Sequence, residues 1–233
     1  MCIRDRSIRG TARRAQLDLP AYGSGTLDAK LALVKPPAAA ALLSGNVTLS
    51  DATLPFAAFI KAATQSSAGE WATQIPLAFD VSATVGKNVR VRGSGYGAGL
   101  DIGATGSVRL GGTLAAPELA GAFQSTGGTL TYFDRAFRVQ EGSVRFNAAD
   151  GVLPTLHAVA TSSVVNPDPD RARNPYGSAQ VTITVEGPIQ GLKIGLQSNP
   201  AGYSRDEILG LIAPFGGFFS GISFSPVSYT HLS

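Results

Sequence analysis

Apolar and polar side chains alternate along four runs of the chain, at residues 127–133, 137–146, 181–185 and 192–196. A period of two sends successive side chains to opposite faces of an extended backbone, so these runs predict β-strands with one apolar and one polar face. The sequence is therefore organised around a sheet that is apolar on one side.

The dipeptide Glu-Gly at residues 141–142 predicts a tight hairpin within the second run. Gly at the second position of a two-residue loop suits a type I′ or II′ turn, where a positive φ is needed. The resulting register places Val139 opposite Val144 on the apolar face. It also places Arg138 opposite Arg145, a like-charge pair whose cost is small if that face is solvated.

The same alternation occurs further upstream, at residues 27–33, 47–49 and 77–85. A three-residue turn at 86–88 is expected to return the chain, so that residues 89–91 pair with the end of the preceding strand. Turn residues recur about every 8–12 positions, which is typical of a meander. The predicted fold class is mainly β, a long antiparallel meander.

Two short helices are expected beside this meander, at residues 56–64 and 204–213. The first has its apolar residues on one side, and Ser204 with Glu207 forms a capping-box pattern at the start of the second. Both are too short to cover a sheet of about ten strands, although an apolar face needs a cover. Either the sheet closes on itself, or it curls and leaves an apolar trough.

Composition supports a β fold and excludes some classes of function. Of the 233 residues, 44% are hydrophobic but only 15% are charged, below the usual share of about 25%. The 28 glycines oppose helix formation. A net charge of +3, with no stripe of Lys or Arg, does not support nucleic-acid binding. The single cysteine, Cys2, excludes a disulfide framework and a thiolate metal site.

Candidate catalytic residues are scarce, so the chain is not expected to be an enzyme or to hold a cofactor or metal. His157 is the single histidine within the patterned region, and it cannot build a hydrolytic metal site by itself. Asp168 and Asp170 form an Asp-x-Asp pair, but no glycine turn and bidentate glutamate follow at calcium-loop spacing. The glycine-rich residues 93–99 lack the lysine of a phosphate-binding loop.

Seven phrases in a fixed order carry a resemblance to a known family. They are Gly-Thr-Leu-x-x-Pro-x-Leu-x-Gly at 112–121, Gly-Gly-Thr-Leu-Thr-Tyr at 127–132, Phe-x-Val-x-x-Gly-Ser-Val-x-Phe at 137–146, Pro-x-Leu at 154–156, Val-x-Ile-x-Val-x-Gly at 181–187, Leu-x-Ser-x-Pro at 196–200 and Ser-x-x-Glu-Ile-Leu at 204–209. The series resembles the C-terminal domain of the TamB family, the inner-membrane-anchored subunit of the translocation and assembly module, which is related to AsmA-like proteins.

The resemblance implies a sheet curled into a taco-like trough, or partly open barrel, with an apolar interior. It implies a periplasmic place in the envelope of a diderm bacterium, with an inner-membrane anchor in a segment missing from this sequence. It also implies an Omp85-type outer-membrane barrel protein as partner. The implied role is to carry phospholipid between the inner and outer membranes, to support outer-membrane protein assembly, or both. No catalytic residues come with it.

Both ends of the chain differ from the patterned region. Residues 1–7 and 226–233 resemble translated adapter sequence and are expected to be non-native. Between them we expect an upstream β segment with a short helix at 8–74 and the TamB-type C-terminal β domain at 75–225. No apolar run reaches the roughly 18 residues needed to span a bilayer, and no signal peptide is visible. The chain is expected to be a piece of a longer protein.

The expected function is a surface on which apolar side chains hold phospholipid acyl chains. The residues expected to line it are Leu130, Tyr132, Phe137, Val139, Val144, Phe146, Val181, Ile183, Val185, Ile194 and Leu196. One alternative is a periplasmic chaperone that pairs its sheet edge with strands of outer-membrane proteins by β-augmentation. The other is a closed structural β-sandwich or adhesin-like passenger.

Overall fold

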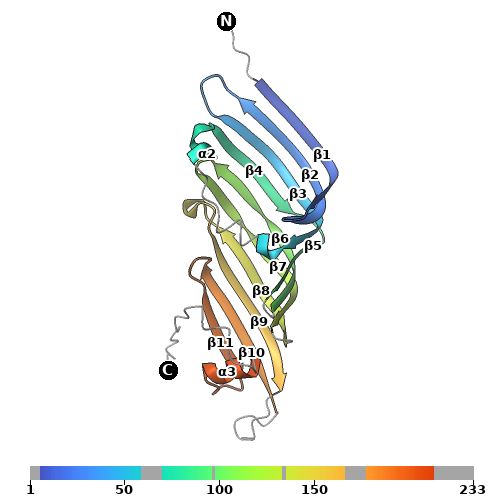
Figure 1. The fold of residues 1–233 in the computed structure, drawn as a ribbon, viewed down its shortest axis with the longest axis vertical. Coiled ribbons are helices and arrows are strands. Elements are labelled where there is room, and N and C mark those ends of the chain that lie inside the picture. The colour runs from blue at the N-terminus through green and yellow to red at the C-terminus, as the bar shows by residue number, and fades with distance from the viewer. Residues whose placement is uncertain (1–5, 59–69, 96–97, 133–134, 166–176, 213–233) are drawn as a thin grey trace.

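The described part of the chain forms one large β-sheet (Figure 1). The structure, a computed structural model, describes residues 6–58, 70–95, 98–132, 135–165 and 177–212. Its strands are β1 (Arg6–Leu19), β2 (Gly23–Lys35), β3 (Ala41–Pro55), β4 (Leu77–Val85), β5 (Val89–Gly95), β6 (Ala98–Gly112), β7 (Pro117–Tyr132), β8 (Arg135–Phe146), β9 (Pro154–Val165), β10 (Ser178–Pro188) and β11 (Lys193–Asn199). Its helical elements are α2 (Glu70–Gln74), a 3₁₀ turn (Ala148–Asp150) and α3 (Arg205–Ile212).

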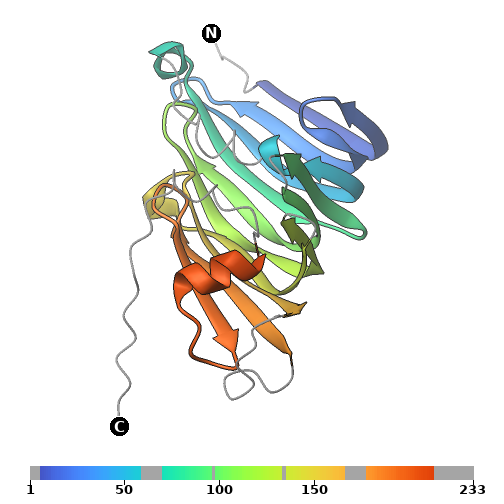
Figure 2. The same ribbon diagram turned by 60° about the horizontal axis from the view of Figure 1, so that its bottom comes forward.

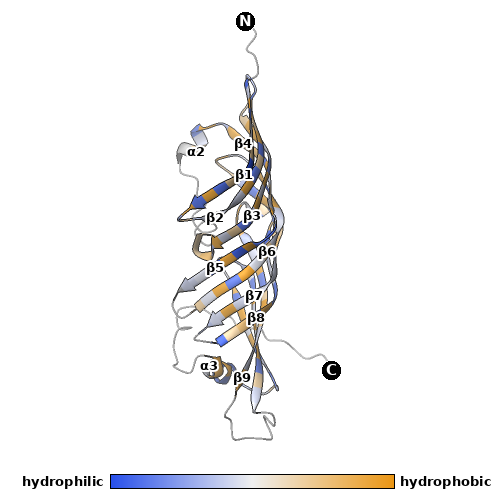
Figure 3. Ribbon diagram, turned by 90° about the vertical axis from the view of Figure 1, so that its right-hand side faces the viewer, coloured by the Kyte–Doolittle hydropathy of each residue, from blue (hydrophilic) through white to orange (hydrophobic). Residues whose placement is uncertain are grey.

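Most strands pair with their neighbours in the chain. The order is β1-β2-β3-β4-β6-β7-β8-β9-β10-β11, and β5 pairs with both β3 and β6. Figure 3 shows the sheet nearly edge-on, with strand ends curling toward the side that carries α2 and α3. Among the described residues β1 and β11 each pair with one strand, so the sheet curls without closing into a barrel. The predicted fold class, a mainly β and largely antiparallel curled sheet, is confirmed.

The hairpin predicted between residues 77–85 and 89–91 is wrong. β4 and β5 both run parallel to β3 and lie end to end between β3 and β6, so the turn at 86–88 does not reverse the chain. Parallel pairing needs a crossover connection of about a dozen residues or more, and residues 56–76 supply one between β3 and β4. A glycine-containing turn can either reverse the chain or let it continue in the same direction, so residues 86–88 alone do not decide between these two paths. The pairing of β4 and β5 with β3 decides it.

The hairpin predicted at residues 141–142 is also wrong, because β8 continues straight through this dipeptide. Val139 pairs with Ala160 of β9 while Glu141 pairs with Val159, so Gln140 is an extra residue in a β-bulge. Such a bulge shifts the alternation by one residue and keeps apolar side chains before and after it on the same face. The shift that resembled a turn in the sequence is therefore a bulge within one strand.

The like-charge pair expected from that hairpin does not occur. Arg138 lies opposite Thr129 of β7 and Thr161 of β9. Arg145 lies opposite Ala122 of β7 and Thr155 of β9. Each arginine therefore has uncharged cross-strand neighbours, because β8 pairs with two other strands and not with itself.

β1 is a strand that the sequence pattern did not reveal. Its positions facing the apolar side include Gly10, Ala12 and Ala15, which are too small to mark a strand by alternation, and two arginines, Arg13 and Arg14, lie between Ala12 and Ala15. The strand forms because its whole length pairs with β2, including a register shift between Ala12 and Ala15. Residues 6 and 7 belong to β1, whereas residues 1–5 and 226–233 lie outside the described part of the chain.

The helix predicted at 204–213 is confirmed as α3. The backbone N–H of Ser204 donates to Glu207 Oε2 at 2.6 Å, and the N–H of Glu207 donates to Ser204 Oγ at 3.3 Å, which is a capping box. Of the helix predicted at 56–64, residues 56–58 are helical and the remainder lies outside the described residues. α2 is a further short helix that the sequence did not indicate.

Strand pairing gathers the apolar side chains on one face of the sheet. A row of directly paired residues crosses seven strands on this apolar face, and we call it the Leu27 row. Its members, from β2 to β9, are Leu27, Leu49, Val85, Gly106, Phe123, Val144 and Leu156. The adjacent row on the opposite, polar face consists of Asp28, Thr48, Thr84, Ser107, Ala122, Arg145 and Thr155.

Two glycines of the apolar face bend the strands that contain them. Gly106 has a φ of 130° and Gly121 a φ of 129°, a region that side chains rarely adopt. Gly106 pairs with Phe123 and Gly121 pairs with Phe146, and the two rings pack edge-to-face with centroids 6.1 Å apart. Glycine bends opposite aromatic residues give a sheet local curvature without exposing bare backbone.

The sheet runs without interruption across residue 75. β3 from the upstream segment pairs along nine residues with β4. The division of the chain into an upstream segment at 8–74 and a C-terminal domain at 75–225 stays a prediction.

Candidate functional site

The part of the apolar face that α3 does not cover, here called the open part, extends from β2 to β9, includes the Leu27 row and reaches Val185 of β10 and Ile194 of β11. Every residue of that row is half-buried. The charged residues at described positions of this face, Arg6, Lys35 and Arg135, stand at strand ends. The open part is thus a continuous hydrocarbon surface without charge along its middle.

The apolar face also has a covered part, where α3 packs over the last strands (Figure 2). Ile208 and Ile212 of α3 are 2% and 0% exposed, and they belong to one cluster with Phe137 of β8, Val164 of β9 and Val181 of β10. The partly buried residues packed against this cluster are Leu130, Tyr132, Val139, Ile183, Leu196, Tyr203, Leu209 and Leu211. Burial raises the pKa of the Tyr132 hydroxyl.

The structure divides the predicted lining residues between these two parts. Seven lie in or against the covered cluster: Leu130, Tyr132, Phe137, Val139, Val181, Ile183 and Leu196. Four lie on the apolar face outside that cluster: Val144, Phe146, Val185 and Ile194. Phe137 and Val181 are 0% exposed, so in this conformation they touch protein and not ligand.

A second row of paired residues joins the open part to the covered part. It begins with Val91 and Ile102, which lie outside the cluster, and continues through Gly128 to Val139. The row then crosses Ala160, Ile183 and Leu196 under α3. No ridge of polar side chains separates the two parts along this row.

Sequence reasoning missed much of the open part because it concentrated on the last third of the chain. Leu49, Val85 and Phe123 are in the same row as Val144. The signal was present, since all three sit at alternating apolar positions. The pairing of residues far apart in the chain, which places them on one face, could not be read from the pattern.

The polar face carries exposed ion pairs between neighbouring strands. Arg90 Nε lies 2.6 Å from Asp101 Oδ1, and Arg92 Nε lies 3.4 Å from the same atom. The hydrogen bond from Arg90 lowers the pKa of the Asp101 carboxyl, and the same bond raises the pKa of Arg90. Arg109 pairs with Asp80 at 2.8 Å. Exposed pairs of this kind contribute little stability, so their main effect is to keep this face wet.

The polar face shows no catalytic arrangement in the described residues. His157 Nε2 lies 3.6 Å from Glu141 Oε2, with both side chains largely in solvent. Across the described ranges, no group of three His, Cys, Asp or Glu side chains could hold a metal ion. Nor does any described helix have the length and apolarity to cross a membrane.

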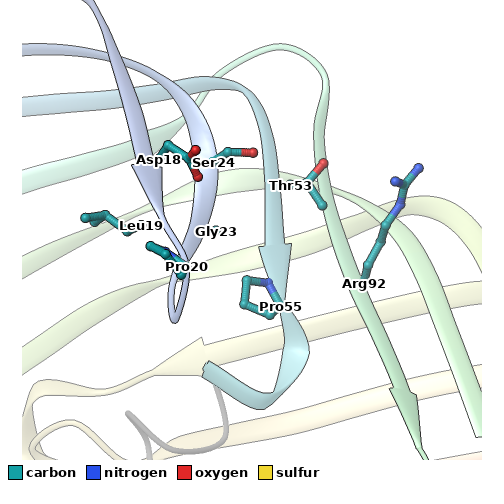
Figure 4. Close-up of a pocket in the computed structure, with 8 residues that line it drawn as sticks. All are labelled: Asp18, Leu19, Pro20, Gly23, Ser24, Thr53, Pro55 and Arg92. Carbon is teal, nitrogen blue, oxygen red and sulfur yellow. The ribbon is translucent and has the colours of Figure 1, made fainter.

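A pocket of about 300 Å³ lies at one corner of the sheet, where the ends of β1, β2, β3 and β5 meet (Figure 4). Its lining residues are Asp18, Leu19, Pro20, Gly23, Ser24, Thr53, Pro55 and Arg92. Leu19 and Arg92 point away from each other in Figure 4. The pocket is open to solvent and does not include the Leu27 row.

A comparison with known protein families gives a match that extends over the whole sheet. A family model described as the TamB C-terminal domain matches residues 5–221, a range that includes all eleven strands and α3. No curated protein matches the chain.

Proposed function

Since this chain belongs to the TamB family, as its C-terminal domain, we propose that the open part of its apolar face carries phospholipid acyl chains between the inner and outer membranes. The family works in the translocation and assembly module of the cell envelope, with an Omp85-type protein as partner. Within that module this sheet acts as a binding and conduit surface, and its chemistry is not enzymatic.

The observation that carries the proposal is the Leu27 row, none of whose residues belongs to the cluster under α3. Its side chains are half-buried on a face where the described residues place no charge between strand ends. Large contiguous apolar patches are rare on protein surfaces unless something binds there. The polar face behind it, with its ion pairs, suits contact with water.

The free energy of such binding comes from the burial of apolar surface area and not from directional contacts such as hydrogen bonds. An acyl chain that buries a few hundred Å² gains several kcal/mol at about 25 cal/mol per Å². Hydrophobic burial has no preferred orientation, so a tail moves along the row without losing its favourable contacts at each step. This property suits transport better than a pocket with fixed hydrogen-bonding groups does.

A pair of neighbouring substitutions tests the proposal. Val144→Asp places a carboxylate in the middle of the Leu27 row, whereas Ser143→Asp adds the same charge on the polar face of the same strand. With a photo-crosslinking amino acid at Leu156, vesicles of phosphatidylethanolamine and phosphatidylglycerol are mixed with the full chain and irradiated. We expect Val144→Asp to reduce labelled lipid by about ten-fold or more, because burying an unpaired charge costs several kcal/mol.

The control variant should label lipid within about two-fold of the parent chain, since its new charge remains hydrated. Far-ultraviolet circular dichroism verifies the sheet in both variants. Equal labelling of the two variants would show that lipid does not lie on the apolar face. Ile183→Asp is a poorer test, because Ile183 packs against the cluster under α3 and its loss changes the fold itself.

Support of outer-membrane protein assembly is a second candidate, favoured by the free edge of β1. This strand of 14 residues pairs with β2 alone among the described strands. A client strand could add to that edge by β-augmentation. Crosslinks from Arg9 on β1 to strands of outer-membrane proteins, with no lipid crosslinks from Leu156, would favour this function over lipid carriage.

A further inference from the structure

α3 occupies the same kind of surface that the proposed function assigns to acyl chains. Its two fully buried isoleucines, Ile208 and Ile212, lie on Phe137, Val164 and Val181 of the sheet. The covered part continues into the open part through the row from Ile102 to Leu196, and only the helix distinguishes them. The sheet beneath α3 is therefore an apolar surface with an occupant already in place.

The amount of hydrocarbon that α3 contributes is similar to that of a lipid tail. Ile208 and Ile212 are buried, and Leu209 and Leu211 are partly buried against the same cluster. These four branched side chains together hold about as much hydrocarbon as one fatty acyl chain. A tail that slides from the open part can therefore replace the contacts that the helix makes.

The helix is also weakly held by its own backbone. α3 has eight residues, and isolated helices of this length are unstable in water, so its folded state depends on packing against the sheet. Its backbone contacts are mainly with β11, the edge strand that precedes it in the chain. Asp206, Glu207 and Gly210 of the helix are exposed, so nothing in the described residues covers its outer side.

We propose that α3 is a displaceable cover that closes the C-terminal end of the apolar face and yields to an acyl chain. This inference rests on the proposed function, because the competing ligand is the tail that the open part carries. With α3 docked, a tail reaches Val185 and Ile194, which lie outside the cluster, but not Val181, Ile183 and Leu196. With α3 displaced, the row through Ile183 and Leu196 becomes the last stage of the path, next to the edge of the sheet.

Photo-crosslinking at two positions tests the cover. One position is Leu156 in the open part, and the other is Leu196 under α3. The full chain is irradiated with vesicles of phosphatidylethanolamine and phosphatidylglycerol, with and without the double substitution Ile208→Asp and Ile212→Asp. In the parent chain we expect lipid labelling at Leu156 and about ten-fold less at Leu196.

In the double variant we expect labelling at Leu196 to rise to the level at Leu156, while labelling at Leu156 changes less than about two-fold. Equal labelling of both positions in the parent chain would overturn the inference, because α3 would then exclude nothing. So would a Leu196 that stays unlabelled after α3 is undocked. Absence of labelling at Leu156 in the parent chain would instead reject the proposed function itself.

A milder variant controls for unfolding of the sheet by the two aspartate substitutions. Ser204→Ala with Glu207→Ala removes the capping box and leaves every sheet residue unchanged. We expect labelling at Leu196 to increase in this variant too, by less than in the aspartate variant, with circular dichroism of the sheet unchanged. No increase would mean that the stability of the helix does not control access to the covered part.

Discussion

At the scale of single residues, Gly121 illustrates how the apolar face acquires its curvature. Its φ of 129° lies outside the range that side chains favour, and a Cβ added there would collide with the backbone carbonyl of Ser107 on β6. Gly111, on the same pair of strands, has nothing within 4 Å of an added Cβ. Position 121 therefore requires a glycine and position 111 does not, a difference that cannot be read from the sequence.

We expect Gly121→Ala to lower the free energy of unfolding by about 1–3 kcal/mol, the usual cost of holding a residue in a disfavoured backbone region. Gly111→Ala should change it by less than about 0.5 kcal/mol. Urea denaturation of the two variants measures the difference. If both alanines had the same small effect, the bend at Gly121 would not be a requirement of the fold.

At the scale of elements, α3 and β8 show opposite outcomes of local sequence signals. The capping box at Ser204 and Glu207 predicts the start of α3 correctly, because both hydrogen bonds join residues three apart. The Glu-Gly dipeptide at 141–142 predicts a turn that does not exist. A turn and a bulge both interrupt alternation, and the pairing of β8 with β7 and β9 together selects the bulge.

The stability of α3 as a separate element leads to a prediction for hydrogen exchange. Loss of an N-cap costs about 1 kcal/mol, so Ser204→Ala should speed exchange of the Ile208 and Ile212 amides by about five-fold. The amide of Val181 in β10 should be unaffected, because the sheet opens in a different unit. Ser163→Ala, an exposed change on β9, serves as the matched control. Faster exchange at Val181 as well would mean that α3 and the sheet unfold together.

At the scale of the whole molecule, the sheet is a single layer whose apolar face is covered only in part by the described residues. No second sheet lies over it in the described ranges, which argues against the closed sandwich considered from the sequence. A ligand that binds the open face, as proposed, would add to the stability of such a single layer.

A lipid with one tail should therefore stabilise the protein. At a lysophospholipid concentration 100 times the Kd, and below micelle formation, linkage predicts about 2.7 kcal/mol, or a rise in Tm of about 5–10 °C. Glycerophosphocholine, which has the head group but no tail, should leave Tm unchanged. Val144→Asp should reduce the rise. A shift of equal size with the head group alone would place the binding site off the apolar face.

The sequence alone determined which residues share a face within the strands that its alternation revealed, the polar character of the opposite face and the position of α3. These features depend on residues two to four positions apart, so the pattern of side chains is sufficient to predict them. The ordered phrases were also sufficient for the family, which the match over residues 5–221 established.

Only the tertiary structure decided the path of the chain at 86–88 and 141–142, and which of the predicted lining residues α3 covers. The parallel pairing of β3 with β4 and the two-sided pairing of β8 join segments far apart in the chain. Likewise, Val139 and Val144 look equivalent in the sequence, yet Val139 packs against the cluster under α3 and Val144 does not. Strand pairing and the packing of α3 on the sheet are contacts between residues far apart in the chain. The local pattern of side chains does not determine the free energies of such contacts.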